Sequence, residues 1–210
     1  MNLLLARHGE SEWIVRGDEA GSNSPLTDRG RQQARLLGRW LAANPLGSSP
    51  SEPALSSAKG RSHEIDAIYA SPLIRARETA EIVAVELGLP VTLDHDLREF
   101  EVPYWHEDES DAPPHINGSA VPPAYLPETY LPFKTRVQEA AQRILQAHQE
   151  STVLIVAHGG TVGTIIRCVL GVHNFGVQTD PTGLHHLRWN GSRWTIEFMN
   201  CLDHLREGIE

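Results

Sequence analysis

Short runs of apolar residues alternate along this chain with longer stretches in which apolar positions recur every three or four residues. Short runs rich in aliphatic residues favour buried strands, and the longer stretches are typical of amphipathic helices. We therefore expect strands at residues 3–6, 65–70, 89–93, 152–157, 184–189 and 194–199. We expect helices at residues 28–43, 73–87 and 131–149, with a fourth running through residues 165–170.

Residues that start and stop regular structure stand at the ends of these stretches. Thr27 is expected to cap the first helix, and Ser71 followed by Pro72 is expected to begin the second. Gly88 and Gly171 follow helical stretches, where a glycine at the carboxyl end favours termination. Asn190-Gly191 separates the last two strands and predicts a tight antiparallel hairpin.

The order of these elements predicts the fold class. Strands that alternate with helices indicate a parallel sheet covered on both faces. We therefore expect a three-layer α/β/α fold whose sheet is mostly parallel, with an antiparallel hairpin at its edge near the C-terminus. Residues 1–210 are expected to form one domain. A flexible loop is expected at 46–62, which is rich in serine, proline and glycine, and a lid insertion at 100–132, where seven prolines disfavour a long helix.

Composition and charge limit the kinds of partner. The net charge of −9 and the absence of a basic run disfavour nucleic acid and anionic membranes as partners. No secretory leader or long apolar stretch is evident, so the predicted location is the cytoplasm and no membrane partner is expected. The two cysteines, Cys168 and Cys201, have no metal-binding or redox spacing. The oligomeric state is left open, with a homodimer retained as one alternative.

Polar residues stand directly after three of the predicted strands. Arg7-His8-Gly9 follows the first strand and His158-Gly159-Gly160 follows strand 152–157, whereas strand 65–70 opens into a helix that carries Arg75. The carboxyl ends of parallel strands meet at one edge of a sheet, where ligands bind. Arginines, histidines and the N–H groups of helix N-termini at one point suit a phosphate group. Taken singly, each could instead be a solvated charge or a surface histidine.

Five segments resemble, in chain order, those of the histidine phosphatase superfamily, which has the phosphoglycerate mutase-like fold. The segments are Arg7-His8-Gly9-Glu10-Ser11, Pro25-Leu26-Thr27-Asp28-Arg29-Gly30, Ser71-Pro72-Leu73-Ile74-Arg75-Ala76-Arg77-Glu78-Thr79-Ala80, Leu97-Arg98-Glu99 and Ala157-His158-Gly159-Gly160. The resemblance extends from Leu3 to about Leu170. It implies a phosphomonoester hydrolase that acts on a small phosphorylated metabolite, and it favours a phosphatase over a mutase.

The resemblance also implies a role for each matching residue. His8 would attack phosphorus and form a phosphohistidine, and Glu99 would protonate the leaving group and then activate water. Arg7, Arg75 and His158 would hold the phosphoryl oxygens. Gly159 and Ser11 complete the candidate phosphate-binding set. No metal and no cofactor are expected, because these side chains already supply positive charge.

Some alternatives stay open at this point. Glu101 lies two residues from Glu99, and in an extended segment both side chains would point the same way. Ile14 stands where the family usually has an asparagine that contributes to phosphate binding, so Asn23, Ser24 or backbone would have to replace it. The rival functions are a cofactor-dependent phosphoglycerate mutase and a non-catalytic module that binds a phosphorylated ligand. A dinucleotide-binding loop at 158–163 is disfavoured, because a histidine replaces its first glycine.

Overall fold

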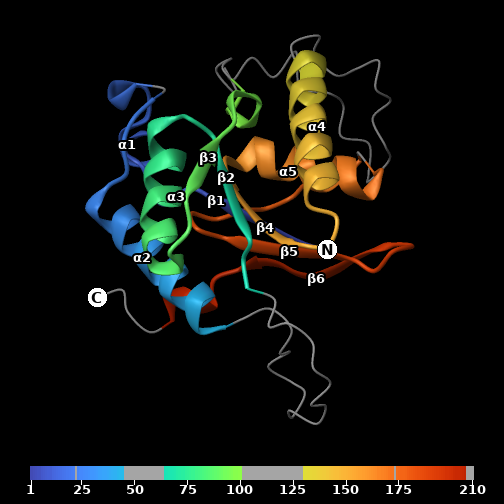
Figure 1. The fold of residues 1–210 in the computed structure, drawn as a ribbon. Helices are drawn as coiled ribbons and strands as arrows, with labels where there is room; N and C mark the ends of the chain where they lie inside the picture. The colour runs from blue at the N-terminus through green and yellow to red at the C-terminus, as the bar shows by residue number, and fades with distance from the viewer. Residues whose placement is uncertain (22, 45–63, 101–129, 173, 207–210) are drawn as a thin grey trace.

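The computed structural model describes residues 1–21, 23–44, 64–100, 130–172 and 174–206, and these form a six-stranded sheet between helices (Figure 1). The strand order is β3-β2-β4-β1-β5-β6. The strands are β1 (Asn2–Arg7), β2 (Ala67–Ala70), β3 (Val91–Leu93), β4 (Thr152–Ala157), β5 (Leu184–Trp189) and β6 (Trp194–Cys201). β1 to β4 are parallel to one another, and β5 and β6 add an antiparallel hairpin at one edge. The predicted fold class is confirmed.

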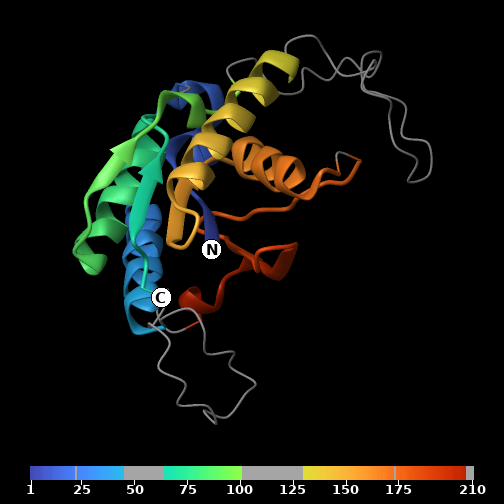
Figure 2. The ribbon, with the colours of Figure 1, turned by 45° about the vertical axis from the view of Figure 1, so that its right-hand side comes forward.

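Five α-helices accompany this sheet in the described part of the chain. They are α1 (Glu12–Arg16), α2 (Asp28–Ala43), α3 (Ile74–Leu87), α4 (Tyr130–Ala147) and α5 (Gly159–Leu170). Short 3₁₀ helices lie at η1 (Gly17–Ala20), η2 (His95–Leu97) and η4 (Asp203–Leu205). α2 and α3 lie together on one side of the sheet, whereas α4 and α5 lie on the other (Figures 1 and 2).

Alternating side chains of β1 build one core on each face of the sheet. Leu3 and Leu5 belong to the core under α4 and α5, with Val137 and Val162. Leu4 and Ala6 belong to the core under α2 and α3, with Leu37 and Val83. All eight side chains are fully buried. Because both faces of β1 are covered, this strand reads as an uninterrupted apolar run rather than an alternating one.

The register between β1 and β4 sets the level of the residues that follow them. Arg7 lies opposite Ala157, so His8 and His158 leave neighbouring parallel strands at the same height. On the other side of β4, Ala70 lies opposite Val156, which places Ser71 beside these residues. Three segments that are far apart in the sequence therefore meet at one edge of the sheet.

Most predicted boundaries are close to the observed ones. Thr27 caps α2 by accepting a hydrogen bond from Gly30 N at 3.0 Å, and Gly88 and Gly171 end α3 and α5 in the left-handed conformation, with φ of 66° and 68°. The hairpin turn at Asn190-Gly191 is also present, with φ of 98° at Gly191. These four predictions are confirmed.

Three local predictions are wrong. β2 begins at Ala67 rather than residue 65. Asp66, which precedes it, contacts the start of β4 by donating from its backbone N to Thr152 O and by accepting from Thr152 N through its carboxylate. β3 begins at Val91 rather than residue 89. Ser71 does not cap α3, because the helix begins at Ile74 and Leu73 is its N-cap residue.

The predicted loop at 46–62 lies outside the described residues, as does 101–129 of the predicted lid at 100–132. Residues 130–132, the end of the predicted lid, form the first turn of α4, and the lid itself stays a prediction. Pro132 is tolerated there, since the first N–H groups of a helix have no partner within the helix.

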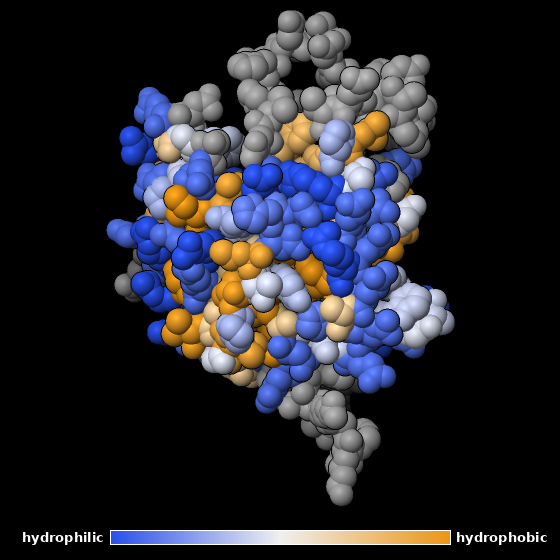
Figure 3. Space-filling model, turned by 45° about the horizontal axis from the view of Figure 1, so that its top comes forward, coloured by the Kyte–Doolittle hydropathy of each residue, from blue (hydrophilic) through white to orange (hydrophobic). Residues whose placement is uncertain are grey.

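The described surface is mixed in polarity. With the top of Figure 1 turned forward, a band of hydrophilic residues crosses the visible face between smaller hydrophobic areas (Figure 3). Exposed large hydrophobic side chains are spread over different elements, such as Val15 on α1, Val85 on α3 and Leu131 on α4. Among the described residues, no helix combines the length and the apolar composition required to cross a membrane.

Candidate active site

His8 has one defined tautomer. Its Nδ1 lies 2.7 Å from Gly9 O, and a carbonyl can only accept, so Nδ1 carries the proton. Arg75 Nε donates to His8 Nε2 at 3.1 Å, so Nε2 carries the lone pair. The pKa of His8 is lowered well below 6.5, first by burial and then by the charges of Arg75 and Arg7. His8 is therefore a neutral imidazole whose Nε2 has an available electron pair.

Two arginines supply positive charge beside His8. Arg75 lies in the first turn of α3 and is 6% exposed, whereas Arg77 is exposed and pairs with Glu81 on the same helix. Arg7 is held by a hydrogen bond from NH1 to Thr179 O at 2.8 Å, and its Nε is buried without a partner. Burial lowers the pKa of both Arg7 and Arg75, and the Glu99 carboxylate opposes this effect at each. Both guanidinium groups remain cationic, because arginine does not lose its proton in proteins.

His158 completes the group at the strand ends. Its ring lies edge to face with that of His8, with 5.2 Å between the ring centroids. Nε2 lies 2.8 Å from Ser71 Oγ, and Nδ1 is buried without a hydrogen-bond partner. Burial lowers the pKa of His158 well below 6.5, with further lowering by the charge of Arg75. His158 is therefore neutral as well.

The carboxylate of Glu99 is seated on the N-terminus of α5. Oε2 accepts a hydrogen bond from Gly160 N at 2.9 Å, and Oε1 accepts one from Phe100 N at 3.0 Å. A Cβ at Gly160 would lie 2.6 Å from Glu99 Oε1, so only glycine leaves room for this arrangement. Gly160 was not among the predicted site residues. The sequence pattern that could have indicated it is the second glycine of His158-Gly159-Gly160.

Arg136, on α4, fixes the backbone that carries Glu99. Its NH1 donates to Asp96 O at 2.8 Å and to Arg98 O at 2.7 Å, and its NH2 donates to Glu99 O at 3.1 Å. One guanidinium therefore holds three carbonyl groups at and after the short helix η2. Sequence analysis missed this residue, because an arginine on an amphipathic helix carries no signal of such a role.

The loop after His8 is braced by α2 and α3. Gly9 N donates to Thr79 Oγ1 at 3.1 Å, and Thr79 Oγ1 donates to Arg75 O at 2.7 Å. Gln33 Oε1 accepts from Glu10 N at 2.8 Å. A Cβ on Gly30 would lie only 1.9 Å from Glu10 O, which explains the glycine in this helix start. The segment beginning at Pro25 therefore packs against the His8 loop and supports it.

The predicted residues Ser11 and Gly159 border this group. Ser11 is fully buried, and its hydroxyl is without a partner. A Cβ at Gly159 would lie 3.9 Å from Arg7 Nε, so the start of α5 is adjacent to the Arg7 guanidinium. Of the candidates to replace the asparagine at Ile14, Ser24 already accepts from Trp13 N and Asn23 Oδ1 accepts from Ile74 N.

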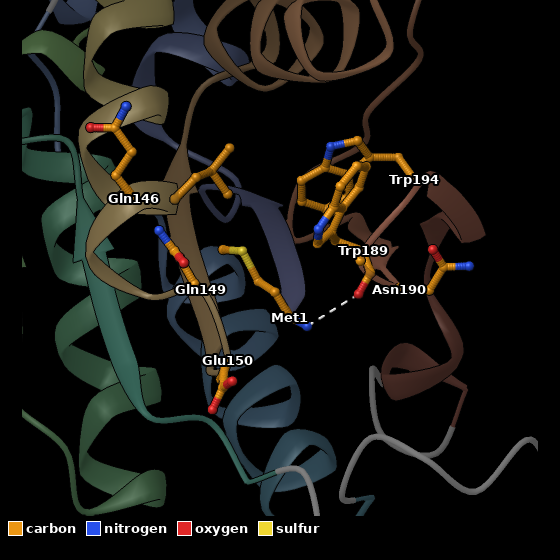
Figure 4. A pocket seen from close by; sticks show the side chains of 9 residues that line it. Met1, Gln146, Gln149, Glu150, Trp189, Asn190 and Trp194 are labelled. Carbon is orange, nitrogen blue, oxygen red and sulfur yellow. Dashed lines mark hydrogen bonds between the residues drawn. The ribbon is translucent and has the colours of Figure 1, made fainter.

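A cavity of about 590 Å³ lies elsewhere and is lined by none of these residues. Met1, Trp189 and Trp194 line it together with the end of α4 (Figure 4). The N-terminal ammonium of Met1 donates to Trp189 O at 3.2 Å. Since Met1 precedes β1 and Trp189 ends the antiparallel β5, this cavity lies at the amino end of the parallel strands. It is opposite the candidate active site.

Comparisons with known proteins agree with this geometry. The family model described as histidine phosphatase superfamily (branch 1) matches residues 3–64 and 54–202 in two overlapping segments. The chain belongs to the histidine phosphatase superfamily. The predicted family is therefore confirmed.

Individual relatives cover nearly the whole chain. A putative phosphoserine phosphatase 2 of Hydrogenobacter thermophilus is 29% identical, over 98% of this chain and 98% of the relative. A probable phosphoglycerate mutase GpmB of Salmonella paratyphi A is 26% identical, over 98% of this chain and 95% of the relative. The structure of Bacillus stearothermophilus YhfR has a TM-score of 0.71 and 29% identity, over 97% and 98% of the two chains. The predicted enzyme class, a phosphatase, is consistent with its family.

The structure brings together the five residues predicted to act on phosphate: Arg7, His8, Arg75, Glu99 and His158. Glu101, the alternative to Glu99, lies outside the described residues. Within the described ranges, no three His, Cys, Asp or Glu side chains are grouped so that they could hold a metal ion.

Proposed function

We propose that this chain is a metal-independent phosphomonoesterase that hydrolyses a small phosphorylated metabolite through a phosphohistidine at His8. The observation that carries this proposal is the neutral tautomer of His8, whose Nε2 lone pair faces Arg75 at 3.1 Å. A nucleophile must present a lone pair, and an anionic substrate needs cations around that lone pair. His8 meets both conditions.

In the first step, the Nε2 lone pair of His8 attacks phosphorus and the bond from phosphorus to the ester oxygen breaks. The leaving oxygen takes the proton of Glu99. Arg7, Arg75 and His158 hold the other phosphoryl oxygens, where negative charge must be stabilised in the transition state. As Nε2 becomes bonded to phosphorus, the imidazole gains positive charge, and the hydrogen bond from Nδ1 to Gly9 O at 2.7 Å stabilises that charge.

In the second step, water attacks the phosphoryl group and gives its proton to Glu99. The bond between phosphorus and Nε2 breaks, and its electron pair returns to His8. Inorganic phosphate leaves. Glu99 gives a proton in the first step and takes one back in the second, so one carboxyl group serves both steps.

A mutase is the second candidate, because one relative is named a probable phosphoglycerate mutase. The two functions differ in what accepts the phosphoryl group from His8. A phosphatase gives it to water, whereas a mutase returns it to a different hydroxyl of the substrate. Phosphate release and interconversion of phosphoglycerate isomers can be measured in the same reaction mixture, so one assay separates the two functions.

The decisive experiment is a panel of phosphomonoesters that includes phosphoserine, sugar phosphates, nucleotides and phosphoglycerates, assayed for phosphate release after exhaustive chelation. We expect hydrolysis of at least one small phosphomonoester, unaffected by the chelator. Loss of activity that an added divalent ion restores would contradict metal independence. Isomerisation without phosphate release would favour the mutase.

A second experiment identifies the nucleophile. A phosphorylated substrate carrying ³²P should give an acid-labile label on the wild-type protein, because phosphohistidine is hydrolysed by acid. The label should be absent from His8→Ala. A label that persists in this variant would place the covalent intermediate on another residue.

A further inference from the structure

The hydroxyl of Ser71 is the side-chain group in hydrogen-bond contact with His158 Nε2. Ser71 directly follows β2, is fully buried, and donates its backbone N–H to Val156 O at 3.1 Å. Its Oγ accepts a hydrogen bond from Leu73 N at 3.3 Å and lies 2.8 Å from His158 Nε2. Since Ser71 is not the cap of α3, the capping rule gives no reason for a serine at this position.

The protons of this group can be counted. A hydroxyl donates one hydrogen bond, and a neutral imidazole carries one N–H. If His158 Nε2 donated to Ser71 Oγ, this oxygen would accept twice and its own proton would have no acceptor among the described residues. If Ser71 donates to Nε2, every proton of the serine is used. The first arrangement leaves two buried groups unpaired, the serine proton and the Nδ1 lone pair of His158, whereas the second leaves only the Nδ1 N–H of His158. Buried polar groups are nearly always paired, so the second arrangement is favoured.

We propose that Ser71 fixes the tautomer of His158 by donating its hydroxyl proton to Nε2, so that the histidine carries its proton on Nδ1. Ser71 is thus a positioning residue, which acts through His158. Nδ1 is the nitrogen of His158 that has no hydrogen-bond partner in the described structure and is buried.

With its proton on Nδ1, His158 can donate a hydrogen bond from this nitrogen but cannot accept one there. His8 presents a lone pair, and His158, whose ring centroid is 5.2 Å away, presents an N–H. On the proposed function, on which this step rests, the N–H of His158 donates to a phosphoryl oxygen while the lone pair of His8 attacks phosphorus. Both neutral histidines are then protonated on Nδ1, His8 through Gly9 O and His158 through Ser71 Oγ. Their tasks differ because different nitrogens are left for the substrate, Nε2 of His8 and Nδ1 of His158.

The tautomer can be measured without any substrate. Protein with ¹⁵N-labelled histidine should give, for His158 at neutral pH, the ¹⁵N shifts of a neutral ring protonated at Nδ1, and His158→Asn assigns the signal by its loss. In Ser71→Ala, we expect a shift toward protonation at Nε2. A wild-type ring that is protonated at Nε2, or charged, would overturn the proposal. This readout does not depend on turnover, so its failure is distinct from failure of the proposed function.

Kinetics provide the second test. With a substrate found in the panel, Ser71→Ala should lower kcat/KM by about 10- to 100-fold, the scale seen when an orienting partner is removed, and Ser71→Thr, which keeps a hydroxyl, should recover most of it. Thr152→Val is the matched control, because Thr152 is a buried hydroxyl at the other end of β4 and bonds Asn2 Nδ2. An unchanged kcat/KM in Ser71→Ala, or an equal loss in a folded Thr152→Val, would overturn the proposal.

Discussion

Arg75 Nε donates a hydrogen bond to the lone pair on Nε2 of His8 over 3.1 Å. A phosphoryl group that approaches this lone pair must take over the hydrogen bond, because Nε2 cannot both accept from Arg75 and bond to phosphorus. The guanidinium therefore moves from the nucleophile to an oxygen of the substrate during the reaction. This exchange needs a long, charged and mobile donor in the first turn of α3, and arginine is such a residue.

Replacing Arg75 should impair transition-state stabilisation. Arg75→Ala is expected to lower kcat/KM by at least about 100-fold, the scale of losing one donor to the transition state. Arg77→Ala is the control on the same helix, because Arg77 is exposed and pairs only with Glu81 in the described structure. It should leave kcat/KM unchanged. Equal losses in the two variants would contradict the assignment.

Substitution of Gly160 tests whether catalysis depends on the position of the Glu99 carboxylate. The Cβ of Gly160→Ala would lie 2.6 Å from Glu99 Oε1 and must displace the carboxylate. Because a displacement of about 1 Å can cost about 100-fold in rate, kcat should fall strongly while the thermal midpoint changes little, since alanine favours a helix.

Gly163→Ala, one turn further along α5, is the control for this change. The nearest atom to its Cβ is Arg167 NH1 at 3.2 Å, the end of a flexible side chain. We expect normal kcat. A normal kcat in Gly160→Ala as well would show that Glu99 is not held where the structure has it during catalysis.

Arg136 should act on catalysis through the Glu99 segment. Arg136→Met removes the donors to Asp96 O, Arg98 O and Glu99 O, and kcat should fall by about 10- to 100-fold through misplacement of the acid. Arg143→Met is the comparison on the same helix, because Arg143 is exposed and pairs with the carboxylates of Asp94 and Asp96. If Arg143→Met is as damaging as Arg136→Met, the carbonyl contacts are not the cause.

Buried histidines should make folding stability depend on pH. Burial lowers the pKa of His185 and of His204 to about 4. Between pH 6.5 and 4, the unfolded chain binds protons at these residues and the folded chain does not, so the free energy of unfolding falls as the pH decreases. Each residue contributes a slope of at most about 1.4 kcal/mol per pH unit, and His8 and His158 act in the same direction.

Urea unfolding at pH 7, 6 and 5 measures this slope. His204→Gln keeps a donor for Thr182 Oγ1, which lies 2.9 Å from His204 Nε2, but it cannot titrate. The slope should be shallower in this variant than in the wild type. Identical slopes would mean that His204 is protonated equally in the folded and unfolded states.

Much of the fold could be predicted from the sequence, because buried strands and the buried faces of helices are rich in apolar residues. β4 and β5 have the predicted bounds. β4 is an apolar run in the middle of the sheet, and the end of β5 is marked by the turn at Asn190-Gly191. β2 and β3 are shorter than predicted, because the pattern of apolar residues does not show where a neighbouring strand begins to pair. α1 was not predicted. It is a short helix held by distant partners, with Glu12 N donating to Pro25 O and Trp13 N to Ser24 Oγ.

Some residues of the candidate site could be predicted from the sequence and others could not. Arg7, His8 and His158 could be placed together because strand ends in a parallel sheet converge, whatever the intervening sequence. Arg136 could not be predicted, because its role comes from packing between α4 and the Glu99 segment. Gly160 carried a signal, as the second glycine of its motif, but its contact with Glu99 comes from packing that the sequence does not show. Ser71 was misread for a local reason. A serine before a proline resembles a helix cap, whereas its hydroxyl faces a histidine 87 positions away.

The pairing of β1 also determines when the site can exist during protein synthesis. β1 lies between β4 and β5, and Asn2 is separated by 150 positions from its partner Thr152. A ribosome therefore makes the nucleophile long before it makes the strands that hold it, and β1 stays unpaired on both edges in the nascent chain. Contacts of such long range slow folding. A product truncated before β4 carries His8 without His158 and without the strand that pairs with β1, so we expect no phosphatase activity from it.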